Sequence, residues 1–471
     1  MFNTVSTFNR ALRILGAFSA AAHLAAPPAL RAQAILANSP ADSLSARALL
    51  DGYVQEALAA NLAIAQQHAA VRRADAAVRE ATGRFMPALD LNARYSEFSG
   101  VVNIGDFINP AYGALNQLLG QQRFPTDVSA TLPFRQESKL ELTLPLYNGA
   151  LFGARAAARA QRDLAGSSRR AAMRQLAADV QQAWLGYATA VRAVETLDAT
   201  MTVLDENVRV SERLIANGQA TPDVLLRARA DRSDLRQQLA DATRQRDIAK
   251  RSFNLLRNAP DDAAVRLVDD STLLEGVNMA RDELLASALR RREELAQSAS
   301  GIAIAKAQQR VSDAAFLPNM ALAASYGIQG DRYRFDRNND VGLASVVLSW
   351  NLFNGTQDAA RREQAAATRT EAEFRQREAK RSVRMHVLNA ADAVETARIS
   401  LAAADDRDAA AQRAFALVQR RYAEGLATQI EFLTARSSAT AAALNRLITR
   451  FTYASRVVEL ERAAALRALP N

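Results

Sequence analysis

The side chains that most often carry out catalysis are scarce in this chain and stand far apart. It has no cysteine, so thiolate nucleophiles, zinc–sulfur sites and disulfides are excluded. The three histidines, His23, His68 and His386, lack the paired spacing of a metal site, and no glycine-rich phosphate loop occurs. We therefore expect no catalytic site, no metal site and no cofactor. We expect His68 and His386 to lie on helix surfaces.

The net charge of +9 is carried almost entirely by arginine. A strongly basic balance can indicate nucleic-acid binding. Here the arginines are spread among Asp and Glu, with no basic stripe interleaved with aromatic residues. We interpret them as solvated helix surface and expect no nucleic-acid partner.

The elements that position these side chains are two copies of a strand followed by a very long helix. Leu140, Leu142, Leu144 and Leu146 alternate with polar residues, and the sequence Pro-Leu-Tyr-Asn-Gly closes the strand at 145–149. No proline follows until after Ala216, which predicts a helix of about 100 Å at ~1.5 Å per residue. Its apolar residues keep a heptad interval over 180–208, typical of supercoiled helices.

The same pattern returns in the second half of the chain. Asn-Leu-Phe-Asn-Gly closes a second strand at 351–355, 206 positions after the first. Phe-Met-Pro at 85–87 is repeated as Phe-Leu-Pro at 316–318. These fixed shifts predict an internal duplication of the unit helix, strand, strand, long helix, helix.

The duplication defines three parts of the chain. Residues 1–34 are expected to be a signal peptide, because Arg10 and Arg13 precede a short apolar run and Ala-Gln-Ala at 32–34 fits a cleavage site. The first repeat is 35–277, with strands at about 88–98 and 138–147 and helices at about 150–216 and 223–257, and with a loop expected over 97–135. The second repeat is 278–471, with strands at about 319–328 and 341–353 and helices at about 356–423 and 428–467.

The four strands are long enough to cross an outer membrane, and aromatic residues stand near both ends. A half-buried sheet of a soluble protein also alternates. Four strands cannot close a barrel, and an open edge cannot sit in lipid, so several chains would have to pool their strands. Two chains would give eight strands, and three would give twelve and room for a pore. The alanine-rich long helices could then form a tube, although an ordinary antiparallel coiled coil is the alternative.

Together, the repeated Phe-x-Pro strand starts, the two Asn-Gly turns and the two Gly-x-Ala-Thr turns give a chain that resembles the TolC-like outer-membrane efflux proteins. The resemblance covers essentially all of the chain after the signal peptide. It implies a mainly α-helical protein with a transmembrane β-barrel part: a homotrimer with a twelve-stranded barrel in outer-membrane lipid and an α-helical barrel projecting into the periplasm. It also implies two partners, a periplasmic adaptor protein and an inner-membrane transporter.

The resemblance further assigns candidate site residues at the far end of the helices. The adaptor-contacting turns would be Gly218, Gln219, Ala220, Thr221, Gly425, Leu426, Ala427 and Thr428. The periplasmic gate would use Asp223 and Tyr422 in a hydrogen-bonded network and Glu431 in an acidic ring. The chain departs from the family at Thr434, where a second acidic residue is expected, and at Ala427, where an arginine often stands.

The turn glycines, the turn threonines and Glu431 also have a plainer interpretation. A glycine ends a helix, a threonine caps the next one, and Glu431 suits a first helical turn because of the helix dipole. The leading hypothesis is a passive exit duct of a tripartite efflux pump or type I secretion system, and not an enzyme. The alternative is an exported structural coiled-coil protein with small β-caps. The sequence does not identify the cargo.

Overall fold

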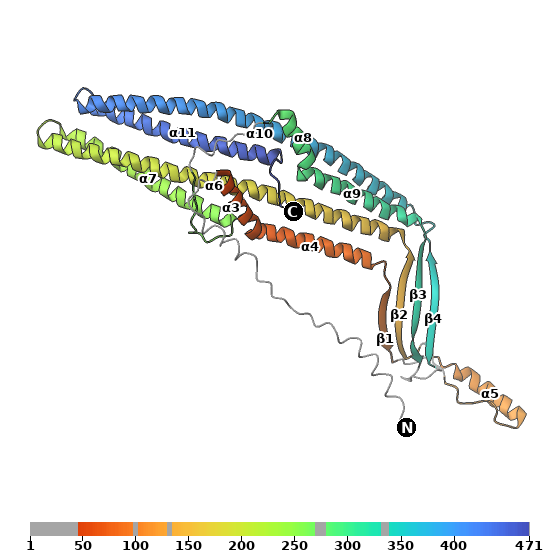
Figure 1. Ribbon diagram of the computed structural model, residues 1–471. Helices are drawn as coiled ribbons and strands as arrows, with labels where there is room; N and C mark the ends of the chain where they lie inside the picture. The colour runs from red at the N-terminus through yellow and green to blue at the C-terminus, as the bar shows by residue number, and fades with distance from the viewer. Residues whose placement is uncertain (1–45, 98–101, 130–133, 269–278, 331–338, 471) are drawn as a thin grey trace.

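The computed structural model describes residues 46–97, 102–129, 134–268, 279–330 and 339–470. The predicted signal peptide lies outside the described residues. The molecule is elongated, with a four-stranded sheet at one end from which long helices extend (Figure 1). None of the described helices is long and apolar enough to cross a membrane.

The helices fall into two similar series. In the first series they are α3 (Ala46–Ala60), α4 (Leu62–Gly83), α5 (Gly105–Leu119), α6 (Gly149–Ala216) and α7 (Pro222–Leu256). In the second they are α8 (Arg281–Arg291), α9 (Glu293–Asp313), α10 (Gln357–Ala423) and α11 (Gln429–Ala463), with a short 3₁₀ turn at Ala314–Phe316. The strands are β1 (Ala88–Tyr95), β2 (Gln136–Tyr147), β3 (Asn319–Gly330) and β4 (Asp340–Ser349).

Asparagine side chains fix where two of these helices begin. Asn148 accepts a hydrogen bond from the Ala150 amide at 3.0 Å at the start of α6. Asn61 separates α3 from α4 and accepts from the Ala63 amide at 2.9 Å. Such caps satisfy amides that the first helical turn leaves free. With its 68 residues, α6 is about 100 Å long.

The sheet is antiparallel in the order β1-β2-β3-β4, so the two repeats meet at the β2–β3 pair. Leu91 stands opposite Leu140, and Leu140 stands opposite Tyr326. Opposed residues share a face, so the register builds one apolar face across all four strands. Its members include Leu89, Leu91, Tyr95, Leu140, Leu142, Leu144, Leu322, Ala324, Tyr326, Ala344, Val346 and Leu348.

The opposite face carries polar and small residues. Asn92 donates to Glu141 at 2.8 Å, and Arg94 pairs with Glu137 at 2.8 Å. Val341, Leu343 and Val347 of β4 are exceptions on this face. The predicted alternation therefore produces two chemically different surfaces of the sheet.

The apolar face of the sheet is uncovered within one chain. Leu91 is 71% exposed and Leu348 is 61% exposed. No described helix lies over the sheet, because the helices continue from its end (Figure 1). The outer strands β1 and β4 each pair on one side only.

The helices form a slab with two open sides. Near the sheet, neighbouring helices lie in the order α4, α6, α9, α10, and farther away in the order α7, α6, α11, α10. The open sides are therefore formed by α4 and α7 at one edge and by α10 at the other. β1 follows α4 at the first edge, and β4 continues into α10 at the second (Figure 1).

The main core gathers around Trp184, which is fully buried on α6. Its indole Nε1 donates to the Arg266 carbonyl at 3.0 Å, and the Arg266 amide donates to the Tyr53 hydroxyl at 2.8 Å. Tyr53 meets Phe253 edge to face at 5.1 Å. The segment 265–268 thus crosses the core as an irregular strap tied to α3 and α6.

Three expectations about the strand region were wrong. The segment 97–135 is not only loop, because α5 forms within it. The strand expected over 341–353 ends at Ser349. Trp350 Nε1 donates to the Phe316 carbonyl at 3.1 Å and Asn351 donates to Asp358 at 2.7 Å, so the chain already turns into α10 there. The first strand also ends at Tyr95, before the expected residue 98.

Candidate functional site

The two predicted turns join the helix hairpins at the end of the molecule farthest from the sheet (Figure 1). Gly218 has φ +70° and Gly425 has φ +75°, values that favour glycine. The following amides return to the preceding helix: Gln219 donates to the Leu214 carbonyl at 2.8 Å, and Leu426 to the Arg421 carbonyl at 2.7 Å. Both turns therefore end their helices through the same glycine-dependent geometry.

The two turns start the next helix differently. Thr428 and Glu431 form a capping box: the Glu431 amide donates to the Thr428 hydroxyl at 3.2 Å, and the Thr428 amide donates to the Glu431 carboxylate at 2.6 Å. In the first repeat the Thr221 hydroxyl donates to the Asp223 carboxylate instead of capping α7.

The Glu431 carboxylate is exposed at the start of α11. Hydrogen bonds from the Thr428 amide, and then from its hydroxyl, hold the pKa of Glu431 below its ordinary value. The plainer capping role is thus present in the structure. It fixes the carboxylate in an ionised, solvent-facing position at the tip.

Asp223 and Tyr422 have different partners within the chain. Asp223 lies 3.8 Å from Arg227, and the Thr221 hydroxyl is the main cause of its lowered pKa. The Tyr422 ring stacks on Phe432 at 4.9 Å, and burial raises the pKa of its hydroxyl. One chain therefore does not bring the two residues of the predicted network together.

A buried amide lies beside Tyr422. The Asn207 side chain of α6 is 4% exposed, and it is the polar side chain that faces the Tyr422 hydroxyl. Neither polar atom of its amide makes a hydrogen bond of good geometry among the described residues. Nothing local in the sequence marks Asn207, because its neighbour Tyr422 comes from the other repeat.

One further tip contact was missed. Gln429 Nε2 donates to the Val224 carbonyl at 2.8 Å and so joins the first turns of α11 and α7. The two residues are 205 positions apart, and nothing local in the sequence indicates the contact. Of the two departures from the family, Thr434 is exposed and Ala427 is half-buried.

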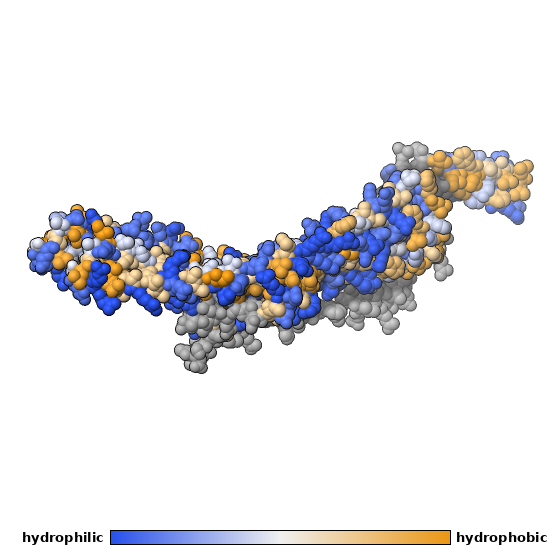
Figure 2. All heavy atoms as spheres, turned by 90° about the horizontal axis from the view of Figure 1, so that it is seen from above, coloured by the Kyte–Doolittle hydropathy of each residue, from blue (hydrophilic) through white to orange (hydrophobic). Residues whose placement is uncertain are grey.

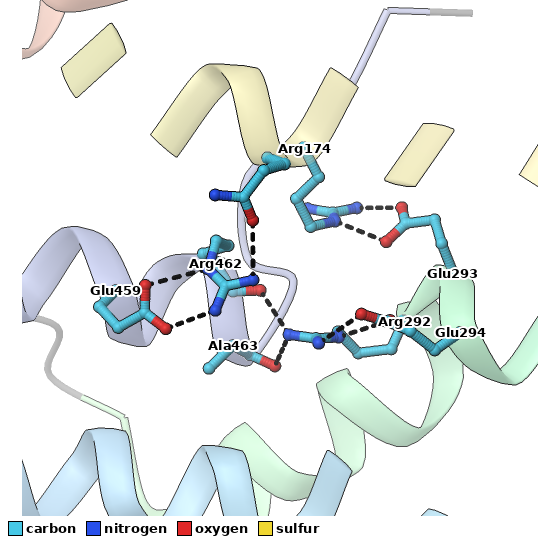
Figure 3. Close-up of polar contacts among 8 residues, drawn as sticks. Arg174, Arg292, Glu293, Glu294, Glu459, Arg462 and Ala463 are labelled. Carbon is cyan, nitrogen blue, oxygen red and sulfur yellow. Dashed lines mark hydrogen bonds and ion pairs between the residues drawn. The ribbon is translucent and has the colours of Figure 1, made fainter. Parts of the chain in front are cut away.

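A second polar cluster lies midway along the helices, where α6, α9 and α11 meet (Figure 3). Arg174 forms a two-point ion pair with Glu293, with Nε–Oε2 at 2.8 Å and Nη2–Oε1 at 2.7 Å. Its third nitrogen, Nη1, donates to the Arg467 carbonyl at 3.0 Å. Both charged side chains are nearly buried, at 11% and 5% exposure.

Arg292 is the second centre of this cluster. It pairs with Glu294 at 2.6 Å and donates to the carbonyls of Arg462 and Ala463 at 3.3 Å each (Figure 3). Burial, the largest single cause, would raise the pKa of Glu294, but the Arg292 hydrogen bond, a backbone hydrogen bond and the charges of Arg292 and Arg462 together lower it. Arg292 thus closes the free carbonyl end of α11 with a buried cation.

The first repeat closes its last helix at the equivalent place. Asn61 Nδ2 donates to the Leu256 carbonyl at 2.8 Å, at the end of α7. Asn61 and Arg292 each stand at the break between two N-terminal helices of their repeat. An amide and a guanidinium therefore perform the same structural task in the two halves.

The chemistry available in these clusters is electrostatic. Among the residues that the structure describes, no group of three or more His, Asp or Glu side chains could hold a metal ion. His68 and His386 are exposed on α4 and α10. What the arrangement offers is an ionised carboxylate at a turn and ion pairs that fix helices to one another.

A protein-family model described as outer membrane efflux protein matches residues 53–256 and 284–466, one block in each repeat. A comparison with curated protein sequences found no significant match. Among solved structures, a membrane protein from Pseudomonas aeruginosa is similar with a TM-score of 0.75 and 21% identity, covering 90% of this chain and 93% of that one.

Two named outer-membrane proteins have the same fold. The Campylobacter jejuni CmeC outer membrane channel gives a TM-score of 0.73 at 15% identity, over 88% of this chain and 85% of its own. The outer membrane protein VceC from Vibrio cholerae gives 0.71 at 19% identity, over 88% and 95%. These likenesses each extend over most of the chain.

Proposed function

Because the chain belongs to the outer membrane efflux protein family, we propose that it is the passive exit duct of a tripartite efflux pump or a type I secretion system. As a family member it lies in the bacterial outer membrane, with its helical part in the periplasm. An inner-membrane transporter would supply the energy, and a periplasmic adaptor would dock at the two tip turns.

The observation that carries the proposal is the pair of open edges. The edge of β1, α4 and α7 and the edge of β4 and α10 lie on opposite sides of one slab. A sheet edge exposed in lipid would leave its amides and carbonyls unpaired. Three copies joined edge to edge would form a closed ring with twelve strands.

The outer helices carry apolar residues where such a ring needs them. On α10, Phe374 is 60% exposed and Ile399 is 59% exposed, and Met385 and Leu417 lie within about 40° of them at ~100° per residue. The packed residues of α10, such as Val383 and Ala390, lie on the opposite side. This helix therefore has two apolar faces, of which its own chain covers one.

The other edge has the same property. Leu226 and Leu255 of α7 are 65% and 74% exposed, and they lie within about 20° of each other around the helix. The buried Leu235 and Phe253 lie on the far side. The α10 edge and the α7 edge thus both expose apolar residues that a neighbouring copy could cover. This favours a ring of several copies over an isolated helical hairpin.

The two faces of the sheet fit the same arrangement. The apolar face would meet lipid, and the face with Asn92, Arg94 and Glu141 would line a water-filled lumen. At the tip, three Glu431 carboxylates around the axis would favour cations. The structural coiled-coil alternative does not account for an uncovered apolar sheet.

The test is purification from the membrane fraction followed by mass determination in detergent and planar-bilayer recording. We expect a heat-modifiable trimer that requires detergent and that forms conducting channels. A freely water-soluble rod without conductance would support the structural alternative instead. If cations block the current and Glu431→Ala abolishes this block, Glu431 is assigned to the gate. If the block is unchanged in that variant, the assignment is wrong.

A further inference from the structure

The helix α5 has its polar and apolar sides reversed relative to an ordinary surface helix. Phe107, Leu115, Leu118 and Leu119 are exposed, and Leu118 reaches 84%. They share one side of the helix at ~100° per residue. Figure 2 shows hydrophobic surface gathered at the end of the molecule where α5 lies.

The chain itself covers the side of α5 that carries Asn109 and Asn116. Asn116 accepts from the amides of Arg123 and Phe124 at 2.9 Å and donates to the Phe124 carbonyl at 2.7 Å. Asn109 exchanges two bonds of 2.9 Å with the backbone of Val128. Two asparagine side chains thus fasten α5 to the segment 121–128 that runs back along it.

The resulting unit is closely packed. A Cβ atom added to Gly105 would lie 1.8 Å from the Val128 carbonyl oxygen, so only glycine fits there. Gly120, with φ +63°, ends the helix, and Tyr112 stacks on Phe124 at 5.3 Å. Because the opposite side of α5 packs against segment 121–128, its apolar side faces outward.

Charge and position decide which partner fits this side. Asp106 is the only charged residue of α5. A helix that lies on a membrane surface usually presents Lys and Arg to the lipid headgroups, and α5 has neither. Packing against identical helices suits an uncharged apolar face, because it brings no like charges together.

The dimensions suit such packing if the proposed trimer is correct. Twelve strands about 4.8 Å apart and tilted by about 40° enclose a barrel about 24 Å across. With 15 residues, α5 is about 22 Å long, which exceeds the barrel radius of about 12 Å. It belongs to the β1–β2 connection at the sheet end opposite the long helices (Figure 1).

We propose that the α5 helices of three copies pack through their apolar faces across the external mouth of the channel. This interaction surface, formed by Phe107, Leu115, Leu118 and Leu119, takes a second copy of the chain as its partner. The cap narrows the exit and hinders passage from outside. It rests on the proposed trimeric duct.

Because the natural chain has no cysteine, single cysteines test the proposal directly. Leu118→Cys, in reconstituted trimers treated with an oxidant, should form disulfide-linked subunits severalfold faster than Gln117→Cys on the adjacent polar side. Serine at both Phe107 and Leu118 should raise the single-channel conductance, whereas serine at Gln117 should leave it unchanged.

Equal cross-linking of the two cysteine variants would overturn the cap. So would quenching of a fluorophore on Leu118→Cys by brominated lipid, which would place the apolar face in the membrane. Mass determination and conductance of the same samples separate the two proposals. A conducting trimer without these cross-links rejects the cap alone, and a non-conducting monomer rejects the duct.

Discussion

The guanidinium of Arg174 and the carboxylate of Glu293 form a buried two-point ion pair that joins α6 to α9. The partners come from different repeats, 119 positions apart. Glu293 is the first residue of α9, so the pair holds the start of that helix against α6. It connects the two halves near the middle of the helical slab.

Replacing Arg174 by Met should lower the free energy of unfolding by about 3–5 kcal/mol, because the buried Glu293 carboxylate is left without its partner. The control is Arg162→Met, which removes an exposed pair with Asp75 and should cost less than about 1 kcal/mol. Thermal melts followed by circular dichroism in detergent would measure both. Equal melting temperatures for the two variants would contradict the assignment of Arg174 as a structural tie.

Gly218→Ala and Gly425→Ala should each destabilise a tip turn by about 1–2 kcal/mol, because both residues have positive φ. No neighbouring atom crowds either position, so the effect isolates backbone conformation. Gly186→Ala is the matched control: it is equally uncrowded but lies inside α6, where alanine should stabilise by about 0.5–1 kcal/mol. We expect hydrogen-exchange protection of the surrounding amides to fall in the two turn variants and to rise in Gly186→Ala.

The sequence was sufficient to predict the parts of the fold that depend on local pattern. These local patterns are the alternation of the strands, the proline-free helices and the glycines with positive φ. Each pattern occurs in both repeats, so each prediction had two independent occurrences in the sequence. β2, for example, extends over Gln136–Tyr147, close to the expected 138–147.

Helix α5 escaped prediction because its local signals conflict. Pro110, Gly105 and Gly113 disfavour a helix, and the two asparagines suggest turns. The deciding bonds, from Asn109 and Asn116 to the returning segment, become visible only when that segment is in place. A tertiary contact overrode propensity.

The polar clusters were equally invisible in sequence. Arg292 reaches the Ala463 carbonyl across 171 positions, and no local spacing distinguishes it from the many other arginines. The tip turns could be located because glycine and threonine mark them. The contacts of Asn207 and Gln429 near the same tip could not be predicted. Residues recognised by backbone geometry could be found, whereas those defined by a distant partner could not.

Replacing Phe374 and Ile399 by serine should weaken the trimer, because an apolar contact worth about 1.5–3 kcal/mol per side chain is lost at each lateral interface. Both side chains are exposed in one chain, so the fold of the subunit should be retained. Arg375→Ser, which removes only the exposed pair with Glu371, is the control. Sedimentation in detergent at decreasing protein concentration would show dissociation of the double variant first, and unchanged assembly would exclude α10 from the interface.

Cation block at the tip should depend on pH through Glu431. Its pKa is lowered in the folded chain, so the carboxylate stays ionised, and the capping bonds persist, until the pH falls below the ordinary titration range of glutamate. The contribution of these capping bonds to stability is complete above the unfolded pKa of Glu431 and is lost as the pH falls through the lowered folded value.

Thr428→Val removes the hydroxyl bond to the carboxylate and leaves the amide bond, so the midpoint of cation block should move part of the way to higher pH. Thr221→Val changes the equivalent turn without touching Glu431, and its midpoint should match that of the unsubstituted protein. A midpoint that moved equally in both variants would mean that the block does not arise from the Glu431 carboxylate.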